Sequence, residues 1–307
     1  VRVTLVVNPS ASSVTGRVRA LVIDALGVDH DLTVAATTSR GHAIELAARA
    51  AATGAEVVVT LGGDGTLNEA ANGLSGTSTA LAVVPAGSTN VFARTLGFDT
   101  HPEKAICQLV AAMAAGSTRR VGLGVANGRH FLFHAGLGFD AEVVERVERY
   151  SILKRYVGQL AFLAAAVVTW AAQDDRRACR LTATLGGGEV LRGAAVLCLK
   201  TDPYTFLGAR PLRVVPGADL DDGLAVLVLP DVRGLTLLAS GAAALGADRG
   251  LDDLPGVELR TGVQDLVVEG DPSLAYQVDG DYLGRPQRVE LHHQAHSLDL
   301  VVPRMHP

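Results

Sequence analysis

The sequence is poor in several residue types, and each shortage excludes a class of protein. Only three cysteines occur among 307 residues, at the widely separated positions Cys107, Cys179 and Cys198. Because they form no CxxC pair and no cluster with histidine, we expect neither a disulfide-rich scaffold nor a structural zinc site, and a reducing, cytoplasmic setting fits best. Aromatic residues make up 4% of the chain, which leaves few side chains on which nucleic-acid bases could stack.

Positive charge and long apolar runs are scarce too. The 27 Lys and Arg residues are outnumbered by 32 Asp and Glu residues, so we expect no nucleic-acid partner. The best candidate for a membrane-spanning helix, residues 157–173, is shorter than the roughly 20 residues that such a helix needs, and we interpret it as a buried helix. The opening apolar run, residues 3–7, ends at Asn8-Pro9 and predicts a buried strand rather than a secretory signal.

Strand and helix patterns alternate in the first third of the chain. Strands that alternate with helices indicate a parallel, Rossmann-like α/β sheet that is covered on both faces. In such sheets ligands bind beyond the carboxyl ends of the strands, so the loops that follow the strands form the candidate site. The patterns predict strands at residues 3–8, 31–36, 56–60 and 80–84, and helices at 16–26, 41–52, from 66 onward and near 89.

The pattern changes near residue 121, where short strand-like runs separated by glycine turns take over. These runs predict a β-rich antiparallel sandwich or barrel with attached helices. The strands are expected at 118–125, 130–135, 180–185, 194–200, 212–215, 224–229, 257–260, 265–268, 275–279 and 288–292, and the helices at 140–150, 153–172 and 233–247. A last strand at 297–302 is expected to return to the first domain. We therefore predict one domain over residues 1–121 plus about 295–307, and a second over 122–294.

The strongest local signal is the glycine loop Gly62-Gly63-Asp64-Gly65-Thr66, between a buried strand and a helix that carries Glu69. Glycines let the backbone approach a ligand, and their amides, with the start of the helix, favour anionic phosphate oxygens. Asp64 has two open interpretations, a water-mediated magnesium contact or a cap that orders the loop. No Gly-Lys-Ser/Thr follows, so this is not a Walker loop.

A second polar loop, Gly87-Ser88-Thr89-Asn90, also leaves a buried strand and enters a helix. Helix capping would explain one of its polar side chains but not all of them. Two further polar loops follow the first two strands, and four such loops around a glycine cradle predict a nucleotide site. The expected nucleotide-binding residues are Asn8, Pro9, Ser10, Thr37, Gly62, Gly63, Asp64, Gly65, Thr66, Glu69, Gly87, Ser88, Thr89 and Asn90.

At these loops the sequence resembles a family. Three segments resemble the diacylglycerol kinase catalytic domain: GGDGTLNEAANGL, PAGSTNVFAR and VVNPS. This family includes bacterial soluble lipid kinases and the sphingosine and ceramide kinases. Three later segments also resemble that family: HAGLGFD at 134–140, the stretch 216–224 with its Asp-Gly-Leu, and QVDGD at 277–281. The matched motifs run in order from residue 6 to residue 281, so they cover nearly the whole chain.

The resemblance implies a two-domain fold like that of NAD kinase and phosphofructokinase. The α/β domain would bind ATP with Mg²⁺, the β-rich domain would receive a lipid, and the site would lie in the cleft between them. Asp279 matches the family's general base, Asp281 follows it in the same motif, and Asp222 matches a structural magnesium ligand of some members. For Asp279-Gly280 and Asp222-Gly223 a hairpin turn stays open as the alternative.

Three positions depart from the family's pattern and leave the activity and the acceptor open. Asp281 stands where the family often has Glu, Val91 follows the loop Asn where better-studied members have Asp, and Ser12 replaces a Gly. No Lys lies near this last position, and Arg17 could substitute for one only loosely.

We expect an ATP-dependent lipid kinase that acts on a lipid hydroxyl and turns diacylglycerol into phosphatidic acid. The alternatives are a kinase for a sphingoid lipid or for another glycerolipid, an NAD kinase, and a protein that binds lipid or nucleotide but has lost its catalytic activity. Such a kinase would be cytoplasmic and peripheral at the inner face of the membrane, where Lys154, Arg155, Arg176 and Arg177, at the ends of the 157–173 helix, could face anionic headgroups. The sandwich interior would take the acyl or sphingoid chain, and a homodimer stays open.

Overall fold

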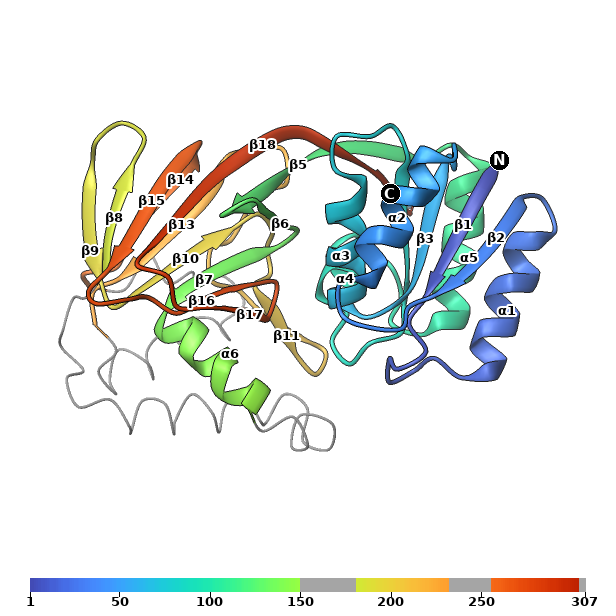
Figure 1. Ribbon diagram of the computed structural model, residues 1–307, viewed down its shortest axis with the longest axis horizontal. Helices are drawn as coiled ribbons and strands as arrows, with labels where there is room; N and C mark the ends of the chain where they lie inside the picture. The colour runs from blue at the N-terminus through green and yellow to red at the C-terminus, as the bar shows by residue number, and fades with distance from the viewer. Residues whose placement is uncertain (150–180, 232–254, 304–307) are drawn as a thin grey trace. The chain divides into compact units, whose positions relative to one another are not determined.

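The computed structural model describes residues 1–149, 181–231 and 255–303, and the chain divides into two compact units. Unit 1 consists of Val1–Leu123 and Ala295–Pro307, and unit 2 of Gly124–Gln294 (Figure 1). Some predicted features lie outside the described residues: the helices at 153–172 and 233–247, the apolar run 157–173 with its basic flanks, and Cys179. Within them, no helix combines the length and the apolar character needed to cross a membrane.

Unit 1 is built on a parallel sheet whose strands lie in the order β2-β1-β3-β4. The strands are β1 (Arg2–Val7), β2 (Asp31–Ala36), β3 (Val57–Gly62) and β4 (Ala80–Pro85). Every residue of β3 and β4 is buried, which is the burial expected of central parallel strands that are covered on both faces. The end of β18 (Arg288–Val301) extends the sheet in parallel, because Leu300 pairs with Leu81.

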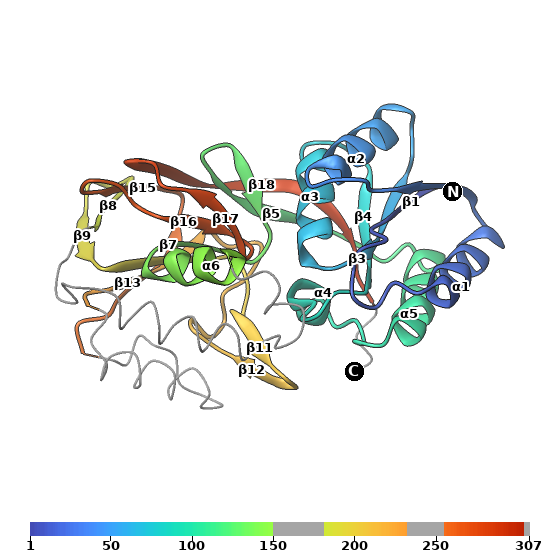
Figure 2. The ribbon, with the colours of Figure 1, turned by 60° about the horizontal axis from the view of Figure 1, so that its bottom comes forward.

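Helices cover both faces of this sheet (Figure 2). On one face lie α2 (His42–Ala52) and α3 (Asp64–Leu74), and on the other α1 (Gly16–Gly27) and α5 (Pro102–Ala114), with the short α4 (Val91–Thr95) before α5. The backbones of α2 and α3 approach closely at Gly73, where an added Cβ would come within 2.4 Å of the carbonyl oxygen of Ile44. The predicted α/β parallel sheet is thus confirmed.

Helix α5 was not predicted from the sequence pattern. Its signals are Pro102 in the first turn, a position that Pro tolerates, and an apolar face of Ala105, Ile106 and Leu109 at helical spacing. This face is buried, and α5 packs against β4 and α1.

Unit 2 contains two antiparallel arrays of strands. One is the six-stranded sheet β14-β13-β10-β7-β16-β17, and in the other β18 pairs with β15, β15 with β8, and β8 with β9. The predicted β-rich antiparallel part is confirmed. The strands are β5 (Thr118–Ala126), which begins in unit 1, β6 (Arg129–Phe131), β7 (His134–Gly138), β8 (Leu181–Leu185), β9 (Val190–Gly193), β10 (Ala195–Leu199), β11 (Thr205–Leu207), β12 (Arg210–Leu212), β13 (Leu224–Leu229), β14 (Glu258–Val263), β15 (Asp265–Gly270), β16 (Tyr276–Val278) and β17 (Asp281–Gly284).

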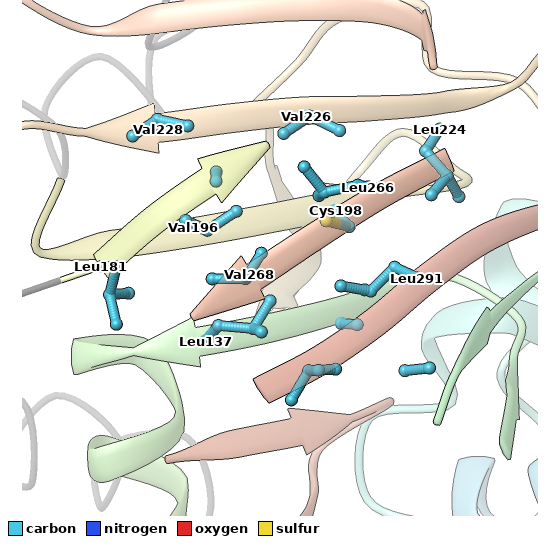
Figure 3. Packing of buried hydrophobic residues seen from close by; sticks show 14 of the residues in the cluster. Leu137, Leu181, Val196, Cys198, Leu224, Val226, Val228, Leu266, Val268 and Leu291 are labelled. Atoms are coloured by element: carbon cyan, nitrogen blue, oxygen red, sulfur yellow. The ribbon is translucent and has the colours of Figure 1, made fainter. Parts of the chain in front are cut away.

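The interior of unit 2 is a packed core. Figure 3 shows side chains from both arrays meeting there, among them Leu137, Val196 and Val226 from the six-stranded sheet and Leu266 and Leu291 from β15 and β18. All five are no more than 2% exposed. The expectation that a lipid chain enters this unit stays a prediction, and the described residues place a cluster of buried apolar side chains in its interior.

One strand, β18, joins two segments that were predicted separately at 288–292 and 297–302. The polar run between them suggested a break, but the strand continues because tertiary hydrogen bonds hold it: the His293 amide donates to the carbonyl of Gln264 at 2.8 Å, and the His130 ring lies 2.9 Å from Gln294 Oε1. On the outer face of the six-stranded sheet lies α6 (Phe139–Arg149), which buries Phe139, Val143 and Val147.

Candidate active site

The strand order of unit 1 has a topological switch point between β1 and β3. The chain leaves β1 toward β2 on one side, whereas β3 lies on the other side, so the loops after β1 and β3 diverge. A side-chain hydrogen bond joins these two loops, because Asn8 Nδ2 donates to Thr66 Oγ1 at 2.9 Å. Asn8 Oδ1 in turn accepts the Ser10 amide at 3.0 Å. The fold thus brings together three of the predicted nucleotide-binding residues from the loops after β1 and β3.

The two glycine loops are in direct backbone contact. The Ala86 amide donates to the carbonyl of Gly62 at 2.8 Å, and a Cβ added to Gly87 would lie 2.5 Å from Cα of Gly63. Asn90, in a left-handed conformation with φ of 51°, accepts the Gly87 amide at 2.8 Å and donates to the Gly87 carbonyl at 2.9 Å. Only residues without a side chain permit this approach, and the Asn90 side chain holds the turn closed.

Asp64 caps the helix that follows the second loop. Its carboxylate accepts the amides of Val91 at 2.9 Å and Phe92 at 3.1 Å, the first two residues of α4. Burial raises the pKa of Asp64, while these amides and the Arg94 guanidinium oppose the rise. Of the two open interpretations, the geometry supports the ordering of the loops, and a magnesium contact stays a prediction. Val91 lacks a polar side chain, but its amide completes this link.

Glu69 holds the loop after β2. Its buried carboxylate accepts the amides of Gly41 at 2.8 Å and Ala43 at 3.1 Å, and so caps α2. The Thr37 amide donates to the carbonyl of Val7 at 2.8 Å, at the end of β1. Glu69 and Thr37 thus order the loop that follows β2, and a direct contact of either residue with a nucleotide stays a prediction.

The start of α3 is the predicted anion-binding part of the site. Its N-cap residue, Gly63, has no side chain with which to cap the helix, and a Cβ on Gly65 would meet nothing within 4 Å. The first amides of a helix carry partial positive charge and attract phosphate oxygens. Pro9, Ser10 and Ser88 are exposed around it, and Thr89 is half-buried. Arg94, to which the sequence pattern assigned no role, adds a positive charge close to Asp64.

In unit 2, Asp279 forms both the predicted turn and a backbone anchor. With Gly280 it makes the two-residue connection between β16 and β17, and both residues have positive φ (48° and 83°), as such hairpins require. Its carboxylate accepts three successive amides, those of Leu132 (2.7 Å), Phe133 (3.0 Å) and His134 (3.0 Å). These donors stabilise the charged carboxylate and fix its orientation.

Asp281 lies two residues further, at the start of β17. Its carboxylate is partly exposed, and Arg129 Nη2 lies 3.7 Å from its Oδ2. The catalytic roles of Asp279 and Asp281 stay predictions.

A buried polar network next to Asp279 escaped the sequence reading. Asp140 Oδ1 accepts the Tyr204 hydroxyl at 2.6 Å, and its Oδ2 accepts Gln277 Nε2 at 2.8 Å. Gln277 Oε1 accepts the Gly280 amide at 2.8 Å, so the network reaches the hairpin turn. Burial raises the pKa values of both Asp140 and Tyr204. Its one sequence signal was a polar residue, Gln277, in an otherwise apolar strand.

His134 should make unit 2 sensitive to acid. Its ring is buried against Tyr204, with centroids 4.2 Å apart, its Nδ1 has no hydrogen-bond partner among the described residues, and burial lowers its pKa from 6.5 to about 3. The unfolded chain therefore binds a proton that the folded chain rejects. The free energy of unfolding is therefore unaffected by protonation of His134 above pH 6.5, where the ring is neutral in both states. It decreases as the pH falls from 6.5 toward 3, by at most about 1.4 kcal/mol per pH unit.

We expect His134→Phe, which keeps an aromatic ring, to flatten the loss of stability between neutral pH and pH 5. Urea unfolding at several pH values measures it, with His292→Phe at an exposed position as the matched control. An unchanged pH dependence in His134→Phe would contradict the assignment.

The remaining predicted residue, Asp222, is exposed and lies two residues before the start of β13. It does not form the hairpin that was its alternative interpretation, because the residue pair Asp222-Gly223 does not connect two paired strands. Its carbonyl oxygen accepts a hydrogen bond from the Lys200 ammonium.

A parallel sheet covered by helices on both faces, with two glycine loops in contact at its edge and a β-rich antiparallel unit in the same chain, defines a class of two-domain α/β fold. Comparisons with known proteins identify the family. The family model for the diacylglycerol kinase catalytic domain matches residues 2–126. The "Probable lipid kinase YegS-like" of Pseudomonas aeruginosa is 31% identical over 289 residues, 89% of this chain and 86% of that protein. A "Diacylglycerol kinase" of Staphylococcus saprophyticus is 30% identical over 253 residues, 81% of this chain and 78% of that protein.

Solved structures show the same fold. A diacylglycerol kinase from Bacillus anthracis matches with a TM-score of 0.71 at 20% identity, covering 98% of this chain and 96% of that one. An NAD kinase from Archaeoglobus fulgidus in complex with ATP matches with a TM-score of 0.56 at 11% identity, covering 98% and 94%. The chain belongs to the diacylglycerol kinase family of bacterial lipid kinases.

Proposed function

We propose that this protein transfers the γ-phosphate of ATP to a lipid hydroxyl, that of diacylglycerol, to give phosphatidic acid. The observation that carries the proposal is the backbone contact between Gly63 and Gly87 at the start of α3, whose N-cap residue has no side chain. This arrangement offers amide donors, and no side chain, to an anionic ligand. The ATP complex of the NAD kinase with the same fold supports a nucleoside triphosphate as that ligand.

Magnesium would accompany the triphosphate and neutralise charge on the phosphate that is transferred. The residues of unit 1 fit such a complex: Asp64 is the carboxylate of the glycine loop, and both its oxygens already accept amide hydrogens. In this proposal Asp64 contacts the ion through water and mainly keeps the two loops together.

The chemistry proposed for unit 2 needs one proton acceptor. As the lipid oxygen attacks the γ-phosphorus, a new P–O bond forms, the bond to the β–γ bridging oxygen breaks, and ADP leaves. The hydroxyl proton passes to the carboxylate of Asp279, which three amides hold charged and oriented. Little covalent help is required, because phosphoryl transfer depends mainly on positioning and charge neutralisation.

The family supports a diacylglycerol acceptor. A sphingoid lipid or another glycerolipid would offer the same reacting hydroxyl, and unit 2 would receive its apolar chain. The substrate resides in a membrane, so the proposed enzyme docks there transiently, at the inner face in a cytoplasmic setting.

Purified protein with γ-labelled ATP and Mg²⁺ tests this function against diacylglycerol in mixed micelles, a fractionated lipid extract, and NAD. We expect labelled phosphatidic acid and no labelled NADP. Transfer to NAD alone would show an NAD kinase, and saturable ATP binding without transfer to any lipid would show a decayed binding protein. Either result would overturn the proposal.

A further inference from the structure

A buried lysine in unit 2 holds the loop that carries Asp222. Lys200 follows β10 directly, and none of its surface is exposed. Its ammonium lies 3.4 Å from the carbonyl oxygens of Asp219 and Gly223 and donates to the carbonyl of Asp222. The ring Nδ1 of His293, on β18, lies 3.2 Å away. Four acceptors from two separate parts of the chain thus surround one positive charge.

Three of these four acceptors are carbonyl oxygens, the ligand type that a hard metal ion prefers. Backbone carbonyl oxygens commonly bind Ca²⁺ and, less often, Mg²⁺. The resemblance to the family assigned a magnesium ion to Asp222, but here the Asp222 carbonyl accepts a hydrogen bond from the Lys200 ammonium. A divalent ion bound to the same oxygens would lie within a few ångströms of that ammonium and would be strongly repelled.

Acidic side chains of the same loop complement the charge of the lysine. The carboxylates of Asp219, Asp221 and Asp222 lie close enough to the Lys200 ammonium to attract it electrostatically. The loop is also ordered from within, because the Asp221 amide donates to Asp219 Oδ1 at 2.8 Å.

The loop has little room to open for a second cation. At Gly223 an added Cβ would come within 2.6 Å of the carbonyl carbon of Gly262, on β14. Backbone packing therefore closes one side of the loop, and the ammonium fills the other. Among the described residues there is also no group of three His, Cys, Asp or Glu side chains that could hold a metal ion.

We propose that Lys200 is the internal cation of the loop formed by residues 216–223, and that it takes the place of a structural divalent metal in unit 2. The loop is then assembled by the chain itself, and its stability does not depend on Mg²⁺. This property is independent of the phosphate transfer proposed above, in which magnesium accompanies the nucleotide in unit 1.

Thermal unfolding without nucleotide tests the proposal. The Tm of the unaltered protein should stay within about 1 °C between EDTA and millimolar Mg²⁺, whereas Lys200→Met, which keeps the stem but removes the charge, should lower it by about 5 °C or more. Lys104→Met is the matched control, because the Lys104 side chain is 69% exposed and its variant should melt like the unaltered protein. Equal melting of the two variants would overturn the proposal.

Manganese binding provides a second test that does not depend on the folding of a core variant. Electron paramagnetic resonance of Mn²⁺ added to the nucleotide-free protein should show no stoichiometric binding that Asp222→Asn removes. Submillimolar binding that is lost in Asp222→Asn would place a metal at the loop and overturn the proposal.

Discussion

Asp279→Asn is expected to lower phosphate transfer by about 10³-fold per folded molecule, within the range for loss of a general base. The variant should also be less stable. An amide side chain has one oxygen, whereas the carboxylate accepts the Leu132 amide on one oxygen and those of Phe133 and His134 on the other. In either orientation the new NH₂ group faces a backbone N–H, at a cost of about 1–3 kcal/mol.

Because of this anchor, a loss of activity in Asp279→Asn does not identify a base by itself. Transfer must be measured at a temperature where circular dichroism shows the variant folded, and the rate divided by the folded fraction. Nucleotide affinity should stay within about threefold, because the three amides that bind the Asp279 carboxylate belong to unit 2. Wild-type turnover per folded molecule would reduce Asp279 to its structural role.

Asp281→Asn is the matched control for this variant. It lies in the same hairpin, and its ion pair with Arg129 is partly exposed and 3.7 Å long, so its removal should cost less than about 1 kcal/mol. We expect a decrease in transfer below tenfold. A decrease as large as that of Asp279→Asn would move the base assignment toward Asp281.

Gly87→Ala is expected to weaken ATP binding by about 100-fold, equivalent to about 2.7 kcal/mol. The added Cβ would lie 2.5 Å from Cα of Gly63 and 3.0 Å from Asn90 Oδ1. Neither neighbour can move aside easily. One is backbone, and the other belongs to the Asn90 side chain, whose Oδ1 accepts the Gly87 amide and whose Nδ2 donates to the Gly87 carbonyl. The loops must therefore separate, and the amides at the start of α3 lose their arrangement.

Fluorescence titration with a labelled ATP analogue measures this effect. Gly27→Ala is the matched control, since a Cβ at this end of α1 meets nothing within 4 Å and should change neither affinity nor Tm. Gly63→Ala should lie between the two, because its Cβ would be 3.1 Å from Cα of Gly87. Unchanged binding by Gly87→Ala would contradict the proposed phosphate cradle.

Local sequence patterns predicted the parallel sheet correctly because the signals for buried strands are local. Continuous apolar runs, such as the six residues of β3, need no knowledge of their partners. The same reasoning divided β18 in two and missed α5. In β18 the polar stretch near His293 is held by partners distant in sequence, such as Gln264, and α5 has a weak local signal with a Pro in its first turn.

Local sequence patterns are enough to predict the alternation of strands and helices, the positions of the glycine loops and the polar residues that follow the strands. The contacts of those polar residues depend on the folded chain. Asp64, Glu69 and Asp279 each bind backbone amides that lie 27, 28 and 147 residues away along the chain, and Lys200 binds carbonyls of a loop about twenty residues further on. A carboxylate or ammonium in a sequence suits a ligand and a backbone group equally well, because both offer the same hydrogen-bonding chemistry. Which of them it meets depends on how distant segments pack.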